Sequence, residues 1–369
     1  MIKNYFKVAW RNLLRNKAHS FINIAGLSVG LACSLMILLW VQNERSIDAF
    51  HKNSDQLFRV YGKIYSNHKL SGTYDTPGVL SDEIKRRFPE VEYATGMGFG
   101  ETSVFRVGDK SIKIYGNSAG ADYFKMFSYP LLQGTPQTAL NSPHSIAISR
   151  KMAEQFFGSP ENAIGKNILY QNTKNFTITA VFENLPKNVS ESFDFLTNWE
   201  AFLTNNSWAR DMGNIGPATY IMLRKDANAA SVDKRMRSFY DLYYHTNRKT
   251  NSYYIDLALQ PYAETYLNNN LEQGKPDGGR IEYVRIFSII AVFILLIACI
   301  NFMNLTTARS VKRAREIGVR KVVGALRSSL IGQFISESLL ITTLAVTVSL
   351  VLLVALLPVF NQVTQKQIE

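Results

Sequence analysis

Residues Arg309–Arg327 read RSVKRAREIGVRKVVGALR and form a basic segment between two apolar runs. Ile286–Asn304 precedes this segment with nineteen residues that carry no formal charge, and Leu339–Phe360 follows it with twenty-two. A helix needs about 20 apolar residues to cross the hydrocarbon core of a bilayer. The pattern therefore predicts two membrane helices joined by a short basic segment. Because that segment also has a helical pattern, it is a candidate contact for a cytoplasmic protein.

A third apolar run, Phe21–Val41, lies near the N-terminus and contains no charge in twenty-one residues. A basic start and an apolar segment also fit a signal peptide. This run, however, is longer than the ~7–15 residues of a signal core, and the QNERS that follows it is not a cleavage site. We therefore expect a retained membrane helix. Within it, Gly26-x-x-x-Gly30 would let another helix approach closely. Because glycine is common in membrane helices, the alternative is that these two glycines have no special role.

The basic residues predict the orientation of the chain. Residues 1–20 hold five cations and no acid, and residues 305–330 hold seven cations and one acid, which together account for nearly all of the net charge of +12. Lys and Arg accumulate on the cytoplasmic side of membrane proteins. We therefore expect the N-terminus in the cytoplasm and residues 42–282 outside it. Since the charge is concentrated beside the apolar runs, it does not indicate a nucleic-acid partner.

The first residues have the pattern of an amphipathic helix. Lys3, Lys7, Arg11 and Arg15 recur every four residues, and apolar side chains occupy another face. Such a helix is suited to lie on the inner lipid surface. A positive flank without a fixed helix is the alternative.

Residues 42–282 predict a mixed α/β domain. Both cysteines, Cys33 and Cys299, lie in apolar runs, so a packed core and not a disulfide framework must stabilise this domain. Two β-α-β units suggest a split ferredoxin-like sheet, with residues 103–200 inserted as a subdomain. From residue periodicity we expect strands at Leu57–Tyr65, Val91–Phe99, Thr219–Arg224 and Tyr253–Gln260, and helices at Pro77–Phe88, Arg150–Phe157 and Ala229–Tyr244.

No motif predicts catalysis, a metal site or a nucleotide site. Residues 42–282 contain four scattered histidines without paired metal-ligand spacing: His51, His68, His144 and His245. The run TGMGFGE, with Gly96, Gly98 and Gly100, lacks the lysine of a phosphate-binding loop, so we expect a turn there. We therefore expect this chain to be no enzyme, to hold no metal or cofactor, and to bind no ATP itself.

Several stretches together resemble a known family. They are YFKVAWRNLLRNKAHSFINIAGLSVGLA at the N-terminus, ADYFKMFSYPLLQGTP, SIAISRKMAEQFFGSPENAIGKNI and FTITAVFENLP in the outer segment, and AREIGVRKVVGA in the basic segment. With the large segment that follows the first apolar run, they resemble ABC-transporter permeases of the MacB/FtsX type, in the form common in Bacteroidetes. The resemblance extends over essentially all 369 residues.

The resemblance implies a mechanism. Such permeases form a homodimer or pseudo-dimer on a separate cytoplasmic ABC ATPase, which binds the ATP. A coupling helix between the second and third spans transmits the movement of the ATPase to the outer domains, which is called mechanotransmission. The coupling residues implied here are Arg313, Arg315, Glu316, Ile317, Gly318, Arg320, Lys321, Gly324 and Ala325.

The residues of this segment also have a physical interpretation. Ile317, Val322, Val323 and Leu326 form an apolar stripe among cations. Glu316 has a cation four residues away on either side, so a helical ion-pair ladder is the alternative to docking. Glycine costs ~1 kcal/mol in a helix. From Gly318 and Gly324 we therefore expect bends on either side of a short cross-helix.

We expect a multi-pass protein of the bacterial inner membrane that drives export or extraction of a peptide, lipoprotein or drug, with lipid and a periplasmic or outer-membrane protein as further partners. A signalling scaffold that activates a periplasmic cell-wall hydrolase is the alternative, and a receptor without an ATPase is a third. Family members have a fourth span and often a second copy of the unit, so the chain looks like an N-terminal portion.

The expected layout has seven parts. They are the basic helix at 1–20, the first membrane helix at 21–41, the periplasmic core domain at 42–282, the second membrane helix at 283–305, the coupling segment at 306–328, the third membrane helix at 329–360 and a periplasmic tail at 361–369, with an FtsX-like permease region from about 285.

Overall fold

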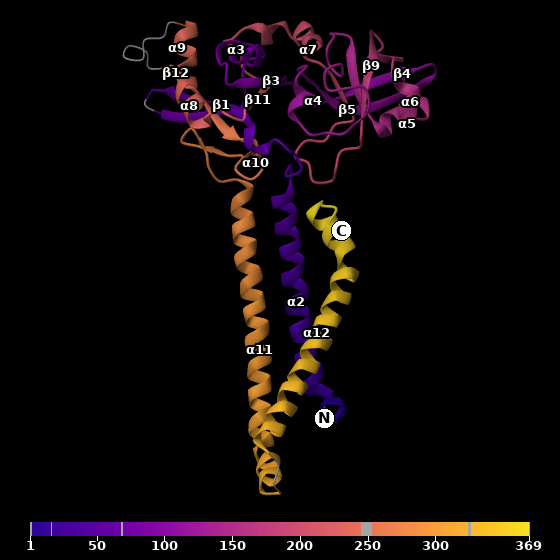
Figure 1. Cartoon of the computed structure of the whole chain (residues 1–369), viewed down its shortest axis with the longest axis vertical. Coiled ribbons are helices and arrows are strands. Elements are labelled where there is room, and N and C mark those ends of the chain that lie inside the picture. The colour runs from indigo at the N-terminus through magenta and orange to yellow at the C-terminus, as the bar shows by residue number, and fades with distance from the viewer. Residues whose placement is uncertain (1, 16, 68, 245–252, 324–325, 369) are drawn as a thin grey trace. The chain divides into compact units, whose positions relative to one another are not determined.

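The computed structural model describes residues 2–15, 17–67, 69–244, 253–323 and 326–368, and the side chains of these residues except 2–6, 309–317 and 320. His68, His245, Gly324 and Ala325 therefore lie outside the described residues. The chain folds as two compact units, one of Met1–Glu44 with Glu282–Glu369 and the other of Arg45–Ile281 (Figure 1).

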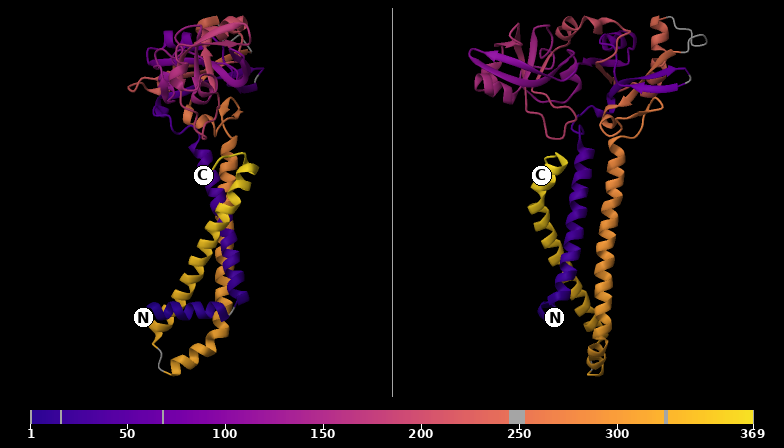
Figure 2. Two further views of the ribbon diagram at one scale, coloured as in Figure 1. Left: turned by 90° about the vertical axis from the view of Figure 1, so that its right-hand side faces the viewer. Right: turned by 180° about the vertical axis from the view of Figure 1, so that it is seen from behind.

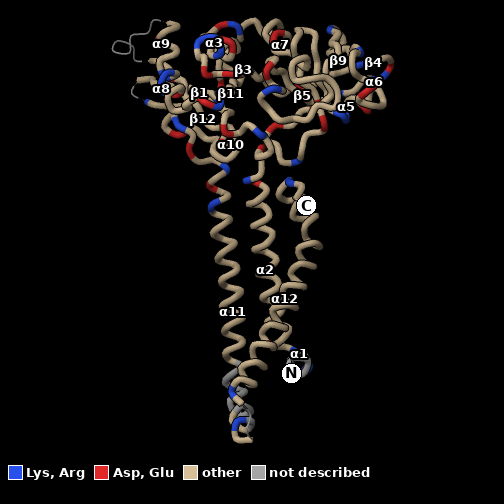
Figure 3. The backbone as a smooth tube through the Cα atoms, viewed as in Figure 1, with Lys and Arg blue, Asp and Glu red and all other residues tan. Residues whose placement is uncertain are grey.

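The first unit is helical. It contains α1 (Ile2–Arg15), α2 (Lys17–Ser46), α11 (Arg280–Val322) and α12 (Arg327–Thr364). Among the described residues, three segments are long and apolar enough to cross a membrane: Lys17–Ser46, Arg280–Ala308 and Arg327–Thr364. Figure 3 shows that the middle of each of these helices carries no charged residue. These helices coincide with the three predicted spans.

Small side chains bring the three long helices together. Leu27 of α2, Ala298 of α11 and Ala345 of α12 form one buried cluster. The Ser28 hydroxyl donates to the Ala345 carbonyl oxygen at 3.0 Å, and the Ser34 hydroxyl donates to the Ala291 carbonyl oxygen at 3.0 Å. Such contacts suit a membrane, where close packing and hydrogen bonds replace hydrophobic burial as the force between helices.

Helix α1 confirms the helical pattern predicted for the N-terminus. It runs across the direction of α2 (Figure 2) and packs against α12. Ala9 is fully buried, whereas Trp10 and Leu14 are about half exposed. An exposed apolar and basic face is what an interfacial helix requires, and a location on the inner lipid surface stays a prediction.

Helix α11 corrects one expectation about the basic segment. The helix continues through Gly318 to Val322, so Gly318 does not end a helix or begin a separate one. The C-terminal part of α11 is turned away from the axis of the remainder (Figure 2). A single glycine costs only ~1 kcal/mol in a helix, which a helix of 43 residues can accommodate.

The second unit is mixed α/β. Its strands are β1 (Leu57–Ser66), β2 (Lys69–Thr73), β3 (Val91–Met97), β4 (Glu101–Val107), β5 (Lys110–Ala119), β6 (Leu131–Gln133), β7 (Ser145–Ser149), β8 (Asn167–Tyr170), β9 (Lys174–Phe182), β10 (Phe195–Asn198), β11 (Ala218–Leu223), β12 (Tyr253–Pro261), β13 (Leu271–Glu272) and β14 (Lys275–Pro276). Its helices are η1 (Ser54–Gln56), α3 (Leu80–Arg87), α4 (Tyr123–Met126), α5 (Arg150–Phe157), α6 (Pro160–Ala163), α7 (Trp199–Asn205), η2 (Ser207–Arg210), α8 (Ala229–Met236), α9 (Phe239–Tyr244) and α10 (Tyr262–Thr265).

One end of the main sheet contains the two predicted β-α-β units, β1-α3-β3 and β11-α8-α9-β12. Their four strands lie in the order β3-β11-β1-β12, and every neighbouring pair is antiparallel. Apolar side chains of α3, α8 and α9 cover this sheet in one core cluster. The assignment to the split ferredoxin-like class stays a prediction.

The chain between β3 and β11 forms the other end of the sheet, in the order β10-β7-β9-β8-β4-β5. It has its own core, in which Phe105, Ile146, Met152 and Phe195 are almost fully buried. The two ends join where β5 pairs with β3 at Met97 and Ala119.

Two local expectations were wrong. The predicted helix Ala229–Tyr244 is two helices, α8 and α9. Gly96 is part of strand β3 and not of a turn. A side chain at position 96 would meet the ring of Trp199, whose indole N–H donates to the Gly78 carbonyl oxygen at 3.0 Å.

The His51 side chain is buried among aromatic rings in this unit. It is 2% exposed, its Nδ1 accepts a hydrogen bond from the Ser128 N–H at 3.1 Å, and its Nε2 has no hydrogen-bond partner among the described residues. Four rings surround the imidazole, those of Phe50, Phe127, Tyr129 and Tyr262. Burial lowers the pKa of His51 from 6.5 to about 4, because the charged form loses its hydration.

Acid should therefore destabilise this unit through His51. Between pH 6.5 and about 4 the unfolded chain binds a proton that the folded chain does not, so this contribution is complete above pH 6.5 and is lost as the pH falls. Between pH 7 and pH 5 we expect the free energy of unfolding to fall by about 2 kcal/mol. Thermal unfolding at the two pH values should show this loss in wild type and in the exposed control His144→Asn, and a smaller loss in His51→Asn. Equal losses in all three proteins would contradict the assignment.

Candidate functional site

The C-terminal end of α11 exposes apolar side chains between two candidate membrane spans. Four of them stand largely free of the rest of the chain: Val319 (65% exposed), Val322 (89%), Val323 (81%) and Leu326 (72%). Lys321 and Arg327 are exposed beside them. Single exposed apolar residues are ordinary, but a cluster of this kind marks a surface that another molecule covers. Val319 and Val322 lie in α11, Val323 follows it and Leu326 caps α12. We call these four residues the apolar end of α11.

The predicted coupling residues fall on or beside this end. The backbone places Arg313, Arg315, Glu316, Ile317 and Arg320 in α11, and their side chains are outside the description. Gly318 is exposed, and a side chain there would meet nothing within 4 Å. The space beside Gly318 is therefore open, and the docking role of each residue stays a prediction.

Gly26 and Gly30 of α2 lie against α11. A Cβ at position 30 would lie 2.5 Å from the Cβ of Ala298, and a Cβ at position 26 would lie 3.1 Å from Nδ2 of Asn301. Contacts below 3.0 Å essentially never occur between real Cβ atoms. Only glycine at position 30 permits this separation of α2 and α11.

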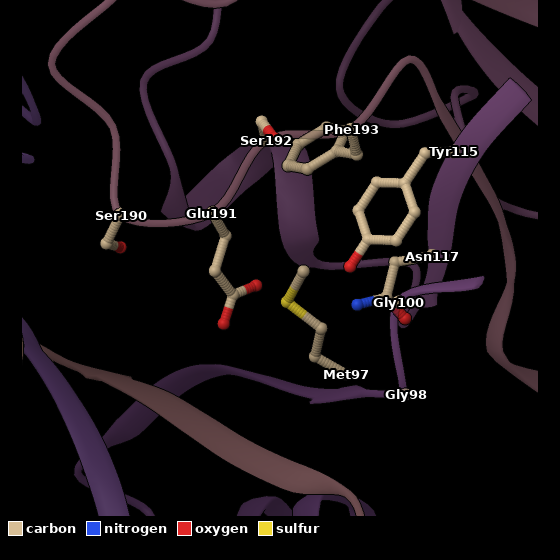
Figure 4. A pocket seen from close by; sticks show the side chains of 9 residues that line it. All are labelled: Met97, Gly98, Gly100, Tyr115, Asn117, Ser190, Glu191, Ser192 and Phe193. Carbon is tan, nitrogen blue, oxygen red and sulfur yellow. The ribbon is translucent and has the colours of Figure 1, made fainter. Parts of the chain in front are cut away.

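The second unit, Arg45–Ile281, which we call the outer unit, contains a pocket of about 310 Å³ at the junction of β3 with β5. Met97 and Phe193 form its apolar wall, and Tyr115, Asn117 and Glu191 direct polar atoms into it (Figure 4). The remaining lining residues are Gly98, Gly100, Ser190 and Ser192. These residues come from separate parts of the chain, so no local motif of the sequence could have identified them.

One charged group dominates this pocket. The Glu191 carboxylate makes no hydrogen bond or ion pair with the described residues. The residue is exposed to solvent, but many protein atoms lie near its carboxylate and partly desolvate it. Burial raises the pKa of Glu191, Arg59 opposes that shift and Asp48 adds to it. Two acids, Glu191 and Asp48, therefore lie near the single cation Arg59, and burial raises the pKa of both acids.

The pocket wall is bonded to the chain that follows α2. The Ser190 N–H donates to Asp48 Oδ1 at 3.0 Å, and the Asp48 N–H donates to the Asn188 carbonyl oxygen at 2.9 Å. Asn188 Nδ2 donates to the Ser46 carbonyl oxygen at 2.8 Å. Three hydrogen bonds therefore connect residues 188–190 to residues 46–48.

Within the described part of the chain, no group of three or more His, Cys, Asp or Glu side chains could hold a metal ion. The described sites thus consist of a helix-packing surface, a polar pocket and an exposed helix end.

Two family models match this chain. The MacB-like periplasmic core domain matches residues 20–239, which is more than half of the chain, and the FtsX-like permease C-terminal model matches residues 288–369. The second match includes the apolar end of α11 and all of α12.

Curated relatives match over almost all of this chain. The pyoverdine export ATP-binding/permease protein PvdT of Pseudomonas syringae is 22% identical over 94% of this chain and 50% of its own length. The macrolide export ATP-binding/permease protein MacB of Neisseria meningitidis is 21% identical over 96% of this chain and 53% of its own length. The chain thus spans about half the length of the curated relatives it matches.

Two solved structures are similar to the outer unit. A permease-protein domain from Porphyromonas gingivalis is 20% identical and covers 64% of this chain and 98% of its own, with a TM-score of 0.48. The periplasmic region of MacB from Actinobacillus actinomycetemcomitans is 14% identical and covers 60% and 92%, with a TM-score of 0.40. On the strength of the two family matches and their relatives, the chain belongs to the family of ABC transporter permeases of the MacB/FtsX type.

Proposed function

We propose that this chain is the permease part of an ABC exporter, in which a cytoplasmic ATPase docks on the apolar end of α11 and drives movement of the outer unit. The observation that carries the proposal is the exposure of Val322 and Val323 beside cations, between two helices that can span a membrane. Burying such side chains against a partner is worth ~1.5–3 kcal/mol for each one.

The relatives support an export function. The printed names of PvdT and MacB combine export with ATP binding. We infer that ATP is bound outside these 369 residues, because their sequence contains no phosphate-binding loop. Those names refer to export, so they do not favour the signalling-scaffold alternative. Peptide, lipoprotein and drug remain the candidate classes of substrate.

The assembly follows from the same reasoning. We propose that two copies, or this chain and a second permease half, form the complex in a bacterial inner membrane. Many large apolar side chains on α11 are exposed, for example Ile289, Phe293 and Ile297. Lipid or a second copy of the chain could cover them. Lipid and a periplasmic or outer-membrane protein are the other expected partners.

Affinity purification of the full protein from its native membrane tests the proposal. We expect an ABC ATPase to co-purify, and we expect ATP hydrolysis in the preparation to depend on that subunit. A purified complex that lacks any ABC ATPase, while the permease remains folded and membrane-bound, would refute the proposed mechanism.

The expected topology can be tested by labelling. We replace Cys33 and Cys299 by alanine and introduce single cysteines at Ser111 and Ser328, which are both exposed. Because Lys and Arg mark the cytoplasmic side, a membrane-impermeant maleimide should label position 111 in intact spheroplasts, and position 328 only after permeabilisation. Labelling of position 328 alone in intact spheroplasts would reverse the topology.

A further inference from the structure

The pocket at the junction of β3 and β5 contains polar groups that lack partners. Asn117 is only 7% exposed, and its Oδ1 accepts a hydrogen bond from the Ser118 N–H at 2.8 Å. Because an N–H can donate only to the amide oxygen, this bond assigns the two ends of the side-chain amide. The amide nitrogen is the end that faces the pocket (Figure 4). This nitrogen donates to no other described residue. Because this nitrogen is not among the fully buried polar atoms that lack a partner, it is open to the pocket and can donate to an acceptor on a ligand.

The other lining groups define the chemistry of a ligand. The Glu191 carboxylate faces the same space as the Asn117 amide (Figure 4), and none of the nine lining residues is Lys or Arg. Met97 and Phe193 supply the apolar surface of the pocket. A few convergent polar groups are what fixes the orientation of a ligand in a small-molecule site, and ~300 Å³ is the lower end of the usual size.

We propose that this pocket binds a small organic ammonium compound that carries an apolar group and a carbonyl, which is the chemistry of the amino end of a peptide with an apolar first residue. Glu191 pairs with the ammonium group, Asn117 donates to the carbonyl oxygen, and the apolar group lies against Met97 and Phe193. The Tyr115 hydroxyl, which also faces the pocket (Figure 4), is a second donor to that oxygen.

Electrostatics supports a cation over an anion. Arg59 lies over the Tyr74 ring at 4.3 Å, and its charge offsets only one of the two nearby acids. A bound ammonium would lower the raised pKa of Glu191 towards its ordinary range, since an opposite charge favours the carboxylate form. An anionic ligand would instead raise the pKa of Glu191 further, since a like charge disfavours the carboxylate form.

Saturation-transfer NMR on the detergent-solubilised chain tests this site, with phenylalaninamide as the probe. We expect saturable binding with a Kd of about 1 mM or tighter, as ligands of this size reach. N-acetylphenylalaninamide has the same ring and carbonyl but no positive charge, and we expect it to bind at least about tenfold more weakly.

Two variants locate the binding, and one serves as the control. Glu191→Gln removes the charge, and Ser192→Trp fills the pocket from an exposed position; each should weaken binding at least about tenfold. Glu154→Gln removes an equally exposed acid on α5, away from the pocket, and should bind as wild type does. An unchanged thermal midpoint verifies that each variant folds.

Three results would overturn the proposal. They are no saturable binding to wild type, equal binding of the neutral analogue, and equal binding to all the variants. The experiment requires no ATPase, so its failure would leave the proposed permease function standing. Failure of an ATPase to co-purify would likewise leave this site standing.

Discussion

Replacing Val322 and Val323 together by glutamate should abolish assembly with the ATPase while leaving the permease folded. Both side chains are more than 80% exposed, so the change costs the isolated chain little. At a docked surface, the loss of two apolar contacts of ~1.5–3 kcal/mol each and the burial of unpaired carboxylates should weaken binding at least about 100-fold. The measurement is ATPase co-purification and ATP-dependent activity at matched membrane levels.

The matched control for this variant is Val363→Glu. Val363 is 78% exposed on α12, so it offers the same chemistry away from the apolar end of α11. We expect the control to co-purify with the ATPase as wild type does. If the double variant also keeps the ATPase and its activity, the basic segment acts only as a topological anchor.

Replacing Gly30 by alanine should loosen the contact between α2 and α11. The new Cβ would lie 2.5 Å from the Cβ of Ala298, so one helix has to move. Overpacking of this kind costs ~1–3 kcal/mol. We expect a lower thermal midpoint for Gly30→Ala in detergent, and we expect the additional change Ala298→Gly to restore most of the loss by removing the opposing Cβ.

A second glycine substitution serves as a control that separates the effect of helix packing from that of helix propensity. Gly318→Ala also replaces a helical glycine, but a Cβ there meets nothing within 4 Å, so it should be neutral or stabilising by up to ~1 kcal/mol. A Gly30→Ala protein as stable as wild type, or one that Ala298→Gly fails to restore, would show that the two helices do not pack through these residues.

Locally encoded elements were predictable from the sequence. Helix α5 was predicted with its observed bounds, Arg150–Phe157. The Ser149 hydroxyl caps its first turn by accepting from the Met152 N–H, and Gly158 ends it with a positive φ of 83°. Both signals lie within one turn of the helix ends, where capping acts. The three membrane helices were predictable for a similar reason, because hydrophobic length is a property of each segment alone.

Features that depend on distant contacts could not be predicted. Val232, Met236, Phe239 and Tyr240 keep helical spacing across the break between α8 and α9, so periodicity predicted one helix. Gly96 looked like a turn residue, yet it lies in a strand where the Trp199 ring leaves no room for a side chain.

The candidate sites divide in the same way. The spacing of Gly26 and Gly30 indicated a close helix contact, but nothing in the sequence identified Ala298 as the residue opposite. The apolar character of Val322, Val323 and Leu326 was visible in the sequence, whereas their exposure required the structure. Glu191 and Asn117 had no signal at all, because only the parallel pairing of β10 with β5, at Leu196 and Asn117, brings their segments together.

The central claim is that ATP bound in the cytoplasm moves the outer unit. The most direct test is the distance between spin labels at Ser111→Cys on two copies, in a cysteine-free permease assembled with its ATPase in lipid. We expect ATP to shift the distance distribution in the wild-type complex and to leave it unchanged when Val322 and Val323 are glutamate. A complex that binds and hydrolyses ATP normally while the distance distribution stays the same would contradict the account.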